Sequence, residues 1–396
     1  MLRKILIGSA ILVLLVIGSG AYLFYKILPS IREVERNAEA KLKILQPRVI
    51  VGADSFKRLT FYNSDGIGNI SQIQVGWPGD REGSDIAVVG NHGADFIESS
   101  GQTIKRIRFS SEQLCEVALA RMDPAGGYGY LTREQSWACP VTLFNQEGKV
   151  VWTSGGRWQG VDDSTAGNIN GDQTLSVVVG LNGGGGIVLL DASGREVWAK
   201  KEANVWHVET LDTNGDGREE IIHSDAGGQL LVRDGKGTKI AQYLPDFYVA
   251  HFALTRWGEE AKPTHILVPV SEKRDGCCKP FLIVLDSAGK KVAELESPMG
   301  DLFDRFNATP VRFKDGSEYF AVLGNYFALG RSILLVYDDR GGIAYQEILG
   351  ESCLGLAALA ERGSDRLLVG CNAKVWEYSE TTGAEKAVKG NISERE

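Results

Sequence analysis

The sequence predicts an all-β fold, a β-propeller of seven blades, preceded by an N-terminal transmembrane helix and a short helical stalk. Short apolar runs separated by Gly, Asn and Asp turns recur along the chain, and helical periodicity is rare after residue 47. The turn glycines are spaced at roughly the 40–50-residue period typical of propeller blades. They are Gly101, Gly148, Gly194, Gly237, Gly289, Gly341 and Gly383.

Residues 1–27 are predicted to form a cytoplasmic N-terminus and a membrane anchor. Arg3 and Lys4 precede an uncharged run from Ile5 to Tyr25, which as a helix would span roughly 30 Å, enough to cross a bilayer. An uncleaved anchor is favoured over a signal peptide because the run is long and lacks an A-x-A-like exit. The basic N-terminus is expected to stay cytoplasmic, which places the rest of the chain in a periplasmic or extracellular space.

Residues 28–47 are predicted to form the stalk. Ser30 and Glu33 make a capping box, and apolar residues follow at helical spacing until Pro47. The propeller is then expected over residues 48–390, with a tail over 391–396.

The repeat is clearest from Asn204 to Leu244, which predicts four short strands joined by tight turns. The best-matched hairpins elsewhere are VTLFNQEGKVVW (141–152), IVLLDASGREVW (187–198) and FLIVLDSAGKKVAEL (281–295). The segment 48–66 is similar to 366–383, which leaves two alternatives. It is either a partial eighth blade, or it donates strands that close a seven-bladed ring and so remove its exposed edges.

One loop of this repeat has the spacing of a calcium site. Oxygen ligands at alternate positions, with glycines that let the backbone curl inward, favour a hard cation. An EF-hand is excluded, because position twelve is His223 and a β-run follows. An Asx-rich turn without an ion is the alternative. The expected ligands are the side chains of Asp212, Asn214, Asp216 and Glu220 and the carbonyl of Arg218.

The segment LDTNGDGREEIIHSDAGGQLLV resembles the FG-GAP/VCBS repeats of integrin α-type propellers. This resemblance implies that Asp212, Asn214, Asp216 and Glu220 bind one Ca²⁺. Gly148–Trp152 and Gly194–Trp198 also resemble the Gly-x-x-x-Trp docking motif of quinoprotein-type propellers. In that family the tryptophan packs between blades.

Two pairs of cysteines occupy matching places in their repeats. Cys115 and Cys139 flank the first two strands of one blade, and Cys353 and Cys371 do the same in the last. The hairpin midpoint at Arg362 places Cys353 opposite Cys371, within bridging distance. Both pairs are therefore expected as disulfides, in an oxidising compartment; buried thiols are the alternative. The adjacent Cys277 and Cys278 form either a vicinal disulfide or two thiols in a turn.

Polar residues recur where the first strand of each blade would line the central channel. Aligning these strands places Ser71, Asp163, His207, His251 and Asn307 in one ring. Asp162, Asp163, His207 and His251 could bind a metal or a polar ligand at the channel mouth. A water-filled lining without a ligand is the alternative.

The net charge of −8 argues against a nucleic-acid partner. The sequence has no HExxH, G-x-S-x-G or P-loop motif, so no enzyme is expected. The predicted function is a membrane-anchored, extracytoplasmic scaffold that binds a protein or glycan and carries a structural calcium loop. The alternative is a quinoprotein-like dehydrogenase.

Overall fold

The computed structural model describes residues 36–76, 86–110, 115–122, 127–133, 139–154, 158, 160–172, 174–255, 264–272, 281–297, 304–314, 316–361 and 363–381. The chain divides into two compact units, Met1–Pro47 and Arg48–Glu396. In the first, residues 36–44 are helical, within the predicted stalk. The predicted anchor over 1–27 lies outside the described residues. Among those that are described, no helix has the length and apolar character needed to cross a membrane.

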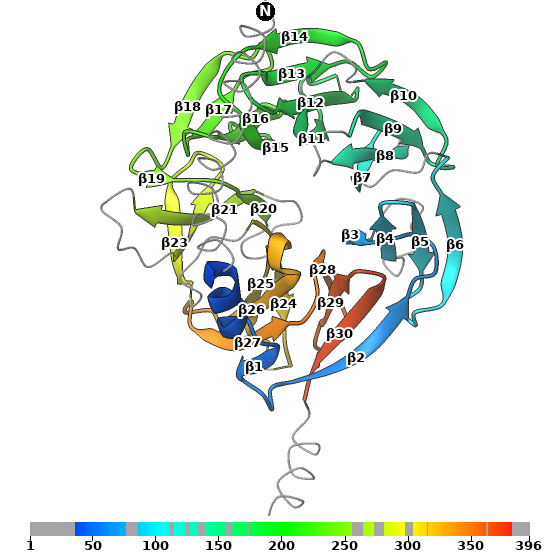
Figure 1. Cartoon of the computed structure of the whole chain (residues 1–396), viewed down its shortest axis with the longest axis vertical. Helices are drawn as coiled ribbons and strands as arrows, with labels where there is room; N and C mark the ends of the chain where they lie inside the picture. Colours follow the sequence, from blue (N-terminus) through cyan, green and yellow to red (C-terminus); the bar gives the residue numbers. More distant parts are fainter. Residues whose placement is uncertain are drawn as a thin grey trace, which may run out of the picture. The chain divides into compact units, whose positions relative to one another are not determined.

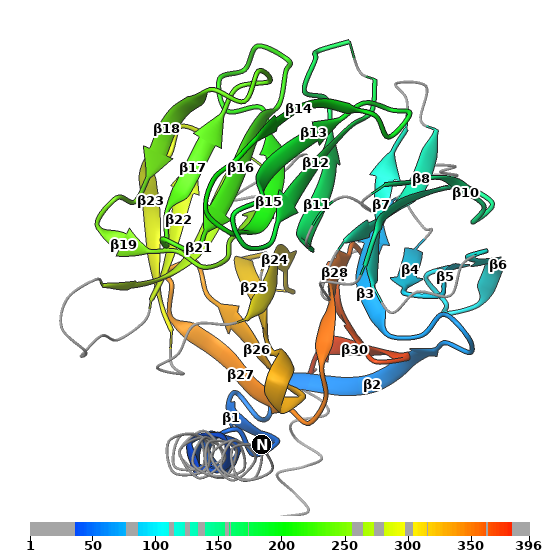
Figure 2. The same cartoon turned by 45° about the horizontal axis from the view of Figure 1, so that its top comes forward.

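The second unit is a seven-bladed propeller, as Figures 1 and 2 show. Each blade is an antiparallel sheet, numbered here in chain order. Blade 1 is β3 (Ile70–Val75), β4 (Ile86–Gly90), β5 (Gly93–Ile97) and β6 (Thr103–Arg108); blade 2 is β7 (Glu116–Arg121), β8 (Tyr128–Arg133), β9 (Val141–Asn145) and β10 (Val150–Ser154). Blade 3 is β11 (Val161–Gly167), β12 (Ser176–Leu181), β13 (Gly186–Leu190) and β14 (Glu196–Lys200).

The remaining four blades follow the same plan, and blades 5 and 6 each have a fifth strand. Blade 4 is β15 (Val205–Leu211), β16 (Glu220–Asp225), β17 (Leu230–Arg233) and β18 (Lys239–Tyr243); blade 5 is β19 (Phe247–Tyr248), β20 (Ala253–Thr255), β21 (His265–Glu272), β22 (Phe281–Asp286) and β23 (Lys291–Glu296). Blade 6 is β24 (Arg305–Arg312), β25 (Glu318–Tyr326), β26 (Arg331–Tyr337), β27 (Ile343–Leu349) and β1 (Arg48–Val51). Blade 7 is β28 (Cys353–Leu359), β29 (Arg366–Cys371), β30 (Lys374–Glu380) and β2 (Phe56–Asn63). A 3₁₀ turn, Phe327–Leu329, links β25 to β26.

The core lies in the middle strands, whose two faces both pack against neighbouring blades. All described positions of β4, β5, β12, β13, β16 and β17 are buried. The outermost strands are largely exposed, as in β14. Continuous apolar runs such as VVVGL in β12 and GIVLL in β13 therefore form the middle strands, because both faces of these strands are removed from water.

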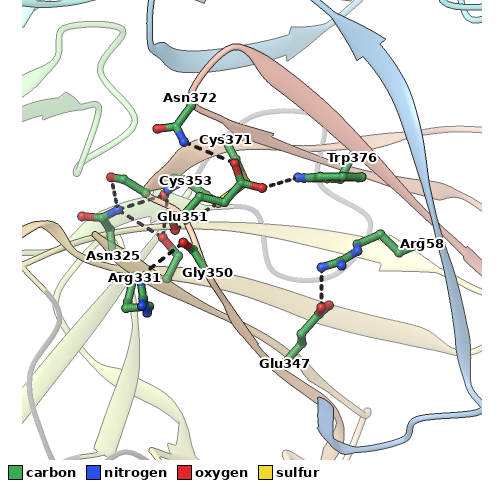
Figure 3. Close-up of a disulfide and its surroundings, with 12 residues drawn as sticks. Arg58, Asn325, Arg331, Glu347, Gly350, Glu351, Cys353, Cys371, Asn372 and Trp376 are labelled. Carbon is green, nitrogen blue, oxygen red and sulfur yellow. Dashed lines mark hydrogen bonds and ion pairs between the residues drawn. A yellow bond between two sulfur atoms is a disulfide. The ribbon is translucent and has the colours of Figure 1, made fainter. Parts of the chain in front are cut away.

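The ring is closed by the start of the propeller chain. The strand β2 pairs with β30 from Phe56↔Glu380 to Asn63↔Lys374 and completes blade 7. The strand β1 pairs with β27 as a fifth strand of blade 6. Residues 48–66 thus donate closing strands and do not form an eighth blade, so seven blades are confirmed. Glu347, buried between blades 6 and 7, accepts bonds from Arg58 of β2 at 2.5 Å (Figure 3) and from Tyr378 at 2.8 Å.

Tryptophans join successive blades, as the quinoprotein-type resemblance implies. The indole Nε1 of Trp152 donates to the Ala192 carbonyl at 2.9 Å, and that of Trp198 donates to the Gly235 carbonyl at 2.9 Å. Each ring lies over a turn glycine of the next blade. A Cβ at Gly194 (φ +77) would lie 2.7 Å from the Trp152 ring, so the turn needs glycine both for its backbone conformation and for space.

Two disulfides lie within the described part of the chain, as predicted. Cys115 bonds to Cys139, with Cα atoms 6.1 Å apart, and Cys353 bonds to Cys371, with Cα atoms 3.9 Å apart. The latter two residues are directly opposite in the β28–β29 ladder, which is the register expected from the hairpin midpoint. This bridge lies beside Glu351, which accepts bonds from Trp376 and Asn372 (Figure 3). Cys277 and Cys278 lie outside the described residues.

Candidate functional site

The first strands of the blades surround the centre of the ring, and several contain a β-bulge at the same level. The ladder register shifts at Ser71 in β3, Asp162 in β11, Trp206 in β15 and Leu354 in β28. A bulge inserts one unpaired residue and redirects the side chains beside it. After three of these bulges, the next side chain contacts the following blade: Gln72 binds Leu119, Asp163 binds His207, and His207 stacks on His251.

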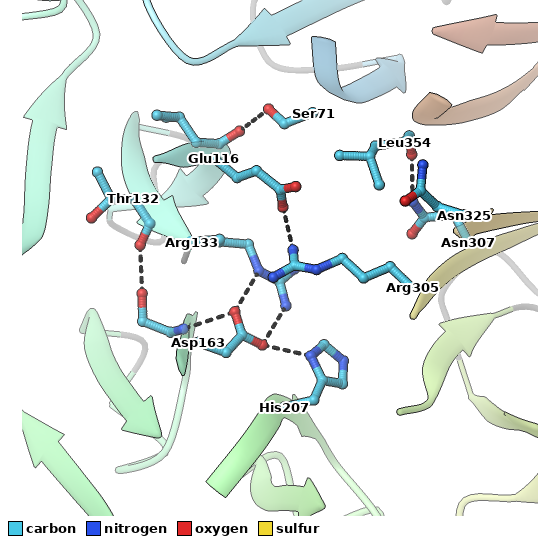
Figure 4. A network of polar contacts seen from close by, with 12 residues as sticks. Ser71, Glu116, Thr132, Arg133, Asp163, His207, Arg305, Asn307, Asn325 and Leu354 are labelled. Atoms are coloured by element: carbon cyan, nitrogen blue, oxygen red, sulfur yellow. Dashed lines mark hydrogen bonds and ion pairs between the residues drawn. The ribbon is translucent and has the colours of Figure 1, made fainter. Parts of the chain in front are cut away.

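Asp163 is the centre of the resulting network (Figure 4). Only 2% of the residue is exposed. Its carboxylate accepts hydrogen bonds from His207 Nδ1 at 2.5 Å, from the backbone N–H of Val208 at 3.1 Å and from that of Ser164 at 2.8 Å. Arg133 of blade 2 also contacts it at 3.4 Å. Burial alone would raise the pKa of Asp163, but Arg133 and His207 reverse this and hold that pKa below its usual range.

His207 and His251 stack face to face, with ring centroids 3.8 Å apart and planes 18° apart. Because the Asp163 carboxylate can only accept this hydrogen bond, the Nδ1 of His207 donates it. His207 Nε2 and His251 Nδ1 are buried and have no hydrogen-bond partner among the described residues. Burial, with His207 and Arg305 nearby, lowers the pKa of His251 well below its usual value, so His251 is neutral at pH 7.

A second ion pair spans the centre of the ring. Arg305, at the start of β24 in blade 6, forms an ion pair with Glu116, at the start of β7 in blade 2. These side chains are 22% and 17% exposed. Burial raises the pKa of Glu116 to about 7, although Arg305 and Arg133 partly oppose this. The carboxyl therefore gains or loses its proton close to neutral pH.

Arg133 connects three blades. It extends from the end of β8 in blade 2 to Asp163 in blade 3 and to Glu209 in blade 4, at 2.8 Å from the latter. Burial would lower the pKa of Arg133, but the two carboxylates outweigh it and raise that pKa, so the guanidinium stays charged. Thr165 also donates to Glu209 at 3.2 Å. The charged groups at the centre of the ring thus compensate one another between blades.

The other predicted channel residues lie outside this charge network. Ser71 lies at a bulge, one residue before the position equivalent to Asp163, and donates to the Val117 carbonyl at 2.5 Å. Gln72 takes the predicted place, since its side-chain oxygen accepts the Leu119 N–H of the next blade at 2.9 Å. Asp162, also at a bulge, binds Asn182 at 3.0 Å. Asn307 donates to the Leu354 carbonyl of blade 7.

The structure therefore brings together Asp163, His207 and His251, and it adds Glu116, Arg133, Glu209 and Arg305, which the sequence alignment missed. One signal was available for Arg305: it lies two residues before Asn307 in the same strand, on the same side of the sheet. For Arg133 there was none, because it extends from the second strand of its blade. The two guanidinium groups disfavour a metal cation at this level of the channel.

The predicted calcium loop connects β15 to β16 and is hydrogen-bonded within itself. Asp212 accepts the N–H groups of Gly215 at 2.7 Å and Gly217 at 3.0 Å. Asn214 accepts the N–H of Asp216 at 2.8 Å, and Asp216 accepts that of Arg218 at 2.8 Å.

Glu220 is also hydrogen-bonded within this loop. It accepts the hydroxyl of Thr213 at 2.6 Å and the amide of Asn214 at 3.1 Å. Within the described part of the chain, no three His, Cys, Asp or Glu side chains are placed to hold one metal ion. In this arrangement the loop has the form of an Asx-rich turn, and calcium binding stays a prediction.

Comparison with known proteins supports the fold and assigns no family. No family model matches the chain, and no curated protein matches it. A crystal structure of BBS1N in complex with ARL6DN matches with a TM-score of 0.50 and 10% identity, over 85% of this chain and 98% of that one. The WD40 domain of Neurospora crassa Pan2 matches with a TM-score of 0.51 and 12% identity, over 85% and 98%. At these identities the matches show a WD40-like propeller fold. The FG-GAP/VCBS resemblance stays a prediction.

Proposed function

We propose that this chain is a binding module: a rigid propeller that presents one of its faces to a protein or glycan partner. The observation that supports this most is the mutual pairing of the channel charges. Asp163, Arg133, Glu116 and Arg305 bind one another across blades, so their charges are used to hold the ring together. A scaffold needs such rigidity, because a preorganised surface loses little entropy on binding.

Two further features are consistent with this proposal. BBS1N, a structural neighbour of the same fold, was crystallised in complex with ARL6DN. The two disulfides fit an oxidising compartment, which agrees with a propeller held outside the membrane by the predicted anchor over 1–27. Calcium at the Asp212–Glu220 loop would stiffen one turn of blade 4 and would take no direct part in recognition.

The test uses the full-length chain, purified in detergent and biotinylated, in two binding assays. The biotinylated chain is applied to a glycan array and to extracellular protein fractions of its source. Each assay is run once with calcium and once with a chelator. The same chain after reduction and heat denaturation is the control. The proposal expects saturable binding that the control lacks. Absence of saturable binding in both assays would contradict it.

The same preparation discriminates the quinoprotein-like alternative. The docking tryptophans Trp152 and Trp198 are accounted for by packing between blades, so they give no specific support for a quinone. The absorbance spectrum of added pyrroloquinoline quinone should therefore stay unchanged, and no dye should be reduced. A spectral shift with substrate-dependent dye reduction would replace the binding module by a dehydrogenase.

A further inference from the structure

The Glu116–Arg305 pair is a direct link between blades that do not adjoin one another. In their sheets, β7 pairs with β8 and β24 pairs with β25, so main-chain hydrogen bonds do not join blade 2 to blade 6. Counted around the ring of seven, these blades are separated by at least two others. The two side chains meet over the centre of the channel (Figure 4).

The surroundings of Glu116 leave Arg305 as its main charged partner. Among the described residues, the charged groups that face it are Arg305 from β24, Arg133 from β8 and Asp163 from β11. Arg133 already forms ion pairs with Asp163 and Glu209. Asp163 repels a charged Glu116, because both are carboxylates. The ionised pair therefore depends on Arg305, while burial favours the protonated carboxyl.

Protonation of Glu116 weakens the hold on Arg305. When Glu116 is neutral, the guanidinium loses the charge of this carboxylate, while Arg133 remains nearby as a like charge and the carboxylates of Asp162 and Asp163 still attract it. Arg305 is 22% exposed, so its head group is already partly in contact with solvent. A buried ion pair is close to energetic balance, because desolvation of the charges offsets most of their attraction. A single proton can then decide the state of the contact.

We propose that Glu116 and Arg305 form a proton-controlled lock across the channel, closed when Glu116 is ionised and released when its carboxylate binds a proton. The release involves one proton bound at a Glu116 carboxylate oxygen and no other bond change. The raised pKa of Glu116, about 7, supports release in mildly acidic conditions. This inference does not depend on the identity of any binding partner.

The test is a double-mutant cycle on the full-length chain with Glu116→Gln, Arg305→Met and both, measured at pH 8 and pH 5.5. Thermal unfolding is followed by the fluorescence of the 8 tryptophans. At pH 8 the two substitutions should be non-additive by about tenfold in the unfolding equilibrium constant, as expected for a charge-assisted hydrogen bond. At pH 5.5 they should be additive within error.

A second cycle combines Glu209→Gln with Arg305→Met. Glu209 belongs to the same network but binds Arg133, so this cycle should be additive at both pH values. If Arg305→Met does not fold, Arg305→Gln, which also removes the positive charge but keeps a polar head group, replaces it in the cycle. Equal coupling of Glu116 and Arg305 at both pH values, or no coupling at pH 8, would overturn the lock.

Discussion

The loop from Asp212 to Glu220 and the network around Asp163 both contain several carboxylates. The two differ in where the hydrogen-bond and ion-pair partners of these carboxylates come from. In the loop, the Asp212 and Asp216 carboxylates accept N–H groups within five residues of themselves. In the channel, Asp163 is bound by Arg133 and His207, which lie 30 and 44 residues away and come from other blades. The loop fixes one turn, whereas the channel contacts fix the ring.

This difference predicts that substitutions at the two places have different effects on the stability of the whole propeller. The loop is largely exposed, so water can replace its lost hydrogen bonds. Asp163 is almost fully buried, and loss of a partner there leaves a charge without compensation. Channel variants should therefore destabilise the whole propeller, and loop variants should affect it little in the absence of an ion.

The largest effect is expected for Arg133→Met. It leaves the carboxylates of Asp163 and Glu209 without their shared cation, and we expect a loss of about 3 kcal/mol in the free energy of unfolding. Chemical denaturation followed by tryptophan fluorescence measures it. Arg195→Met removes an exposed arginine that pairs with Asp191 in a surface turn, and it should cost less than about 1 kcal/mol. Equal costs for the two variants would contradict the structural role of the channel network.

Calcium should produce a smaller effect on stability, which depends on the loop. If the loop binds the ion, calcium at ten times its dissociation constant stabilises the fold by about 1.4 kcal/mol. The melting temperature of the wild type should then rise with calcium, and that of Asp216→Ala should not. A rise that persists in Asp216→Ala would place the ion elsewhere, and no rise in either would leave an Asx-rich turn.

A further effect, which appears only in acid, is the pH sensitivity contributed by His251. This residue is neutral in the folded state, because its pKa lies well below the usual 6.5. Once unfolded it takes up a proton below about pH 6.5, so its contribution to stability is lost as the pH falls through that range. In His251→Gln the melting temperature should fall less between pH 7.5 and pH 5 than in the wild type. Parallel pH profiles would show that His251 is exposed to water.

Local pattern was enough to predict the blades, the docking tryptophans and the cysteine pairs. Cys353 and Cys371 belong to one hairpin, and each Trp reaches the next turn glycine, so the repeat alone relates them. The closing strands were harder, because β2 pairs with β30 from the other end of the propeller. Similarity of 48–66 to 366–383 left two alternatives, which only the observed pairing resolves.

The channel was predicted in part. Repeat alignment identified Asp163, His207 and His251, because all three lie on first strands. It misplaced Ser71 by one residue, since a bulge is not visible in spacing. It missed the Glu116–Arg305 contact, because that contact depends on which blades face each other across a closed ring.

The most direct test of this account compares Asp163→Asn with Asp212→Asn, each measured by chemical denaturation without calcium. Both substitutions remove one charge and keep the size of the side chain. We predict that Asp163→Asn lowers the free energy of unfolding by about 3 kcal/mol, since Arg133 loses a buried partner, and that Asp212→Asn lowers it by less than about 1 kcal/mol. Equal losses, or a larger loss for Asp212→Asn, would contradict the claim that charges in the channel hold the ring together.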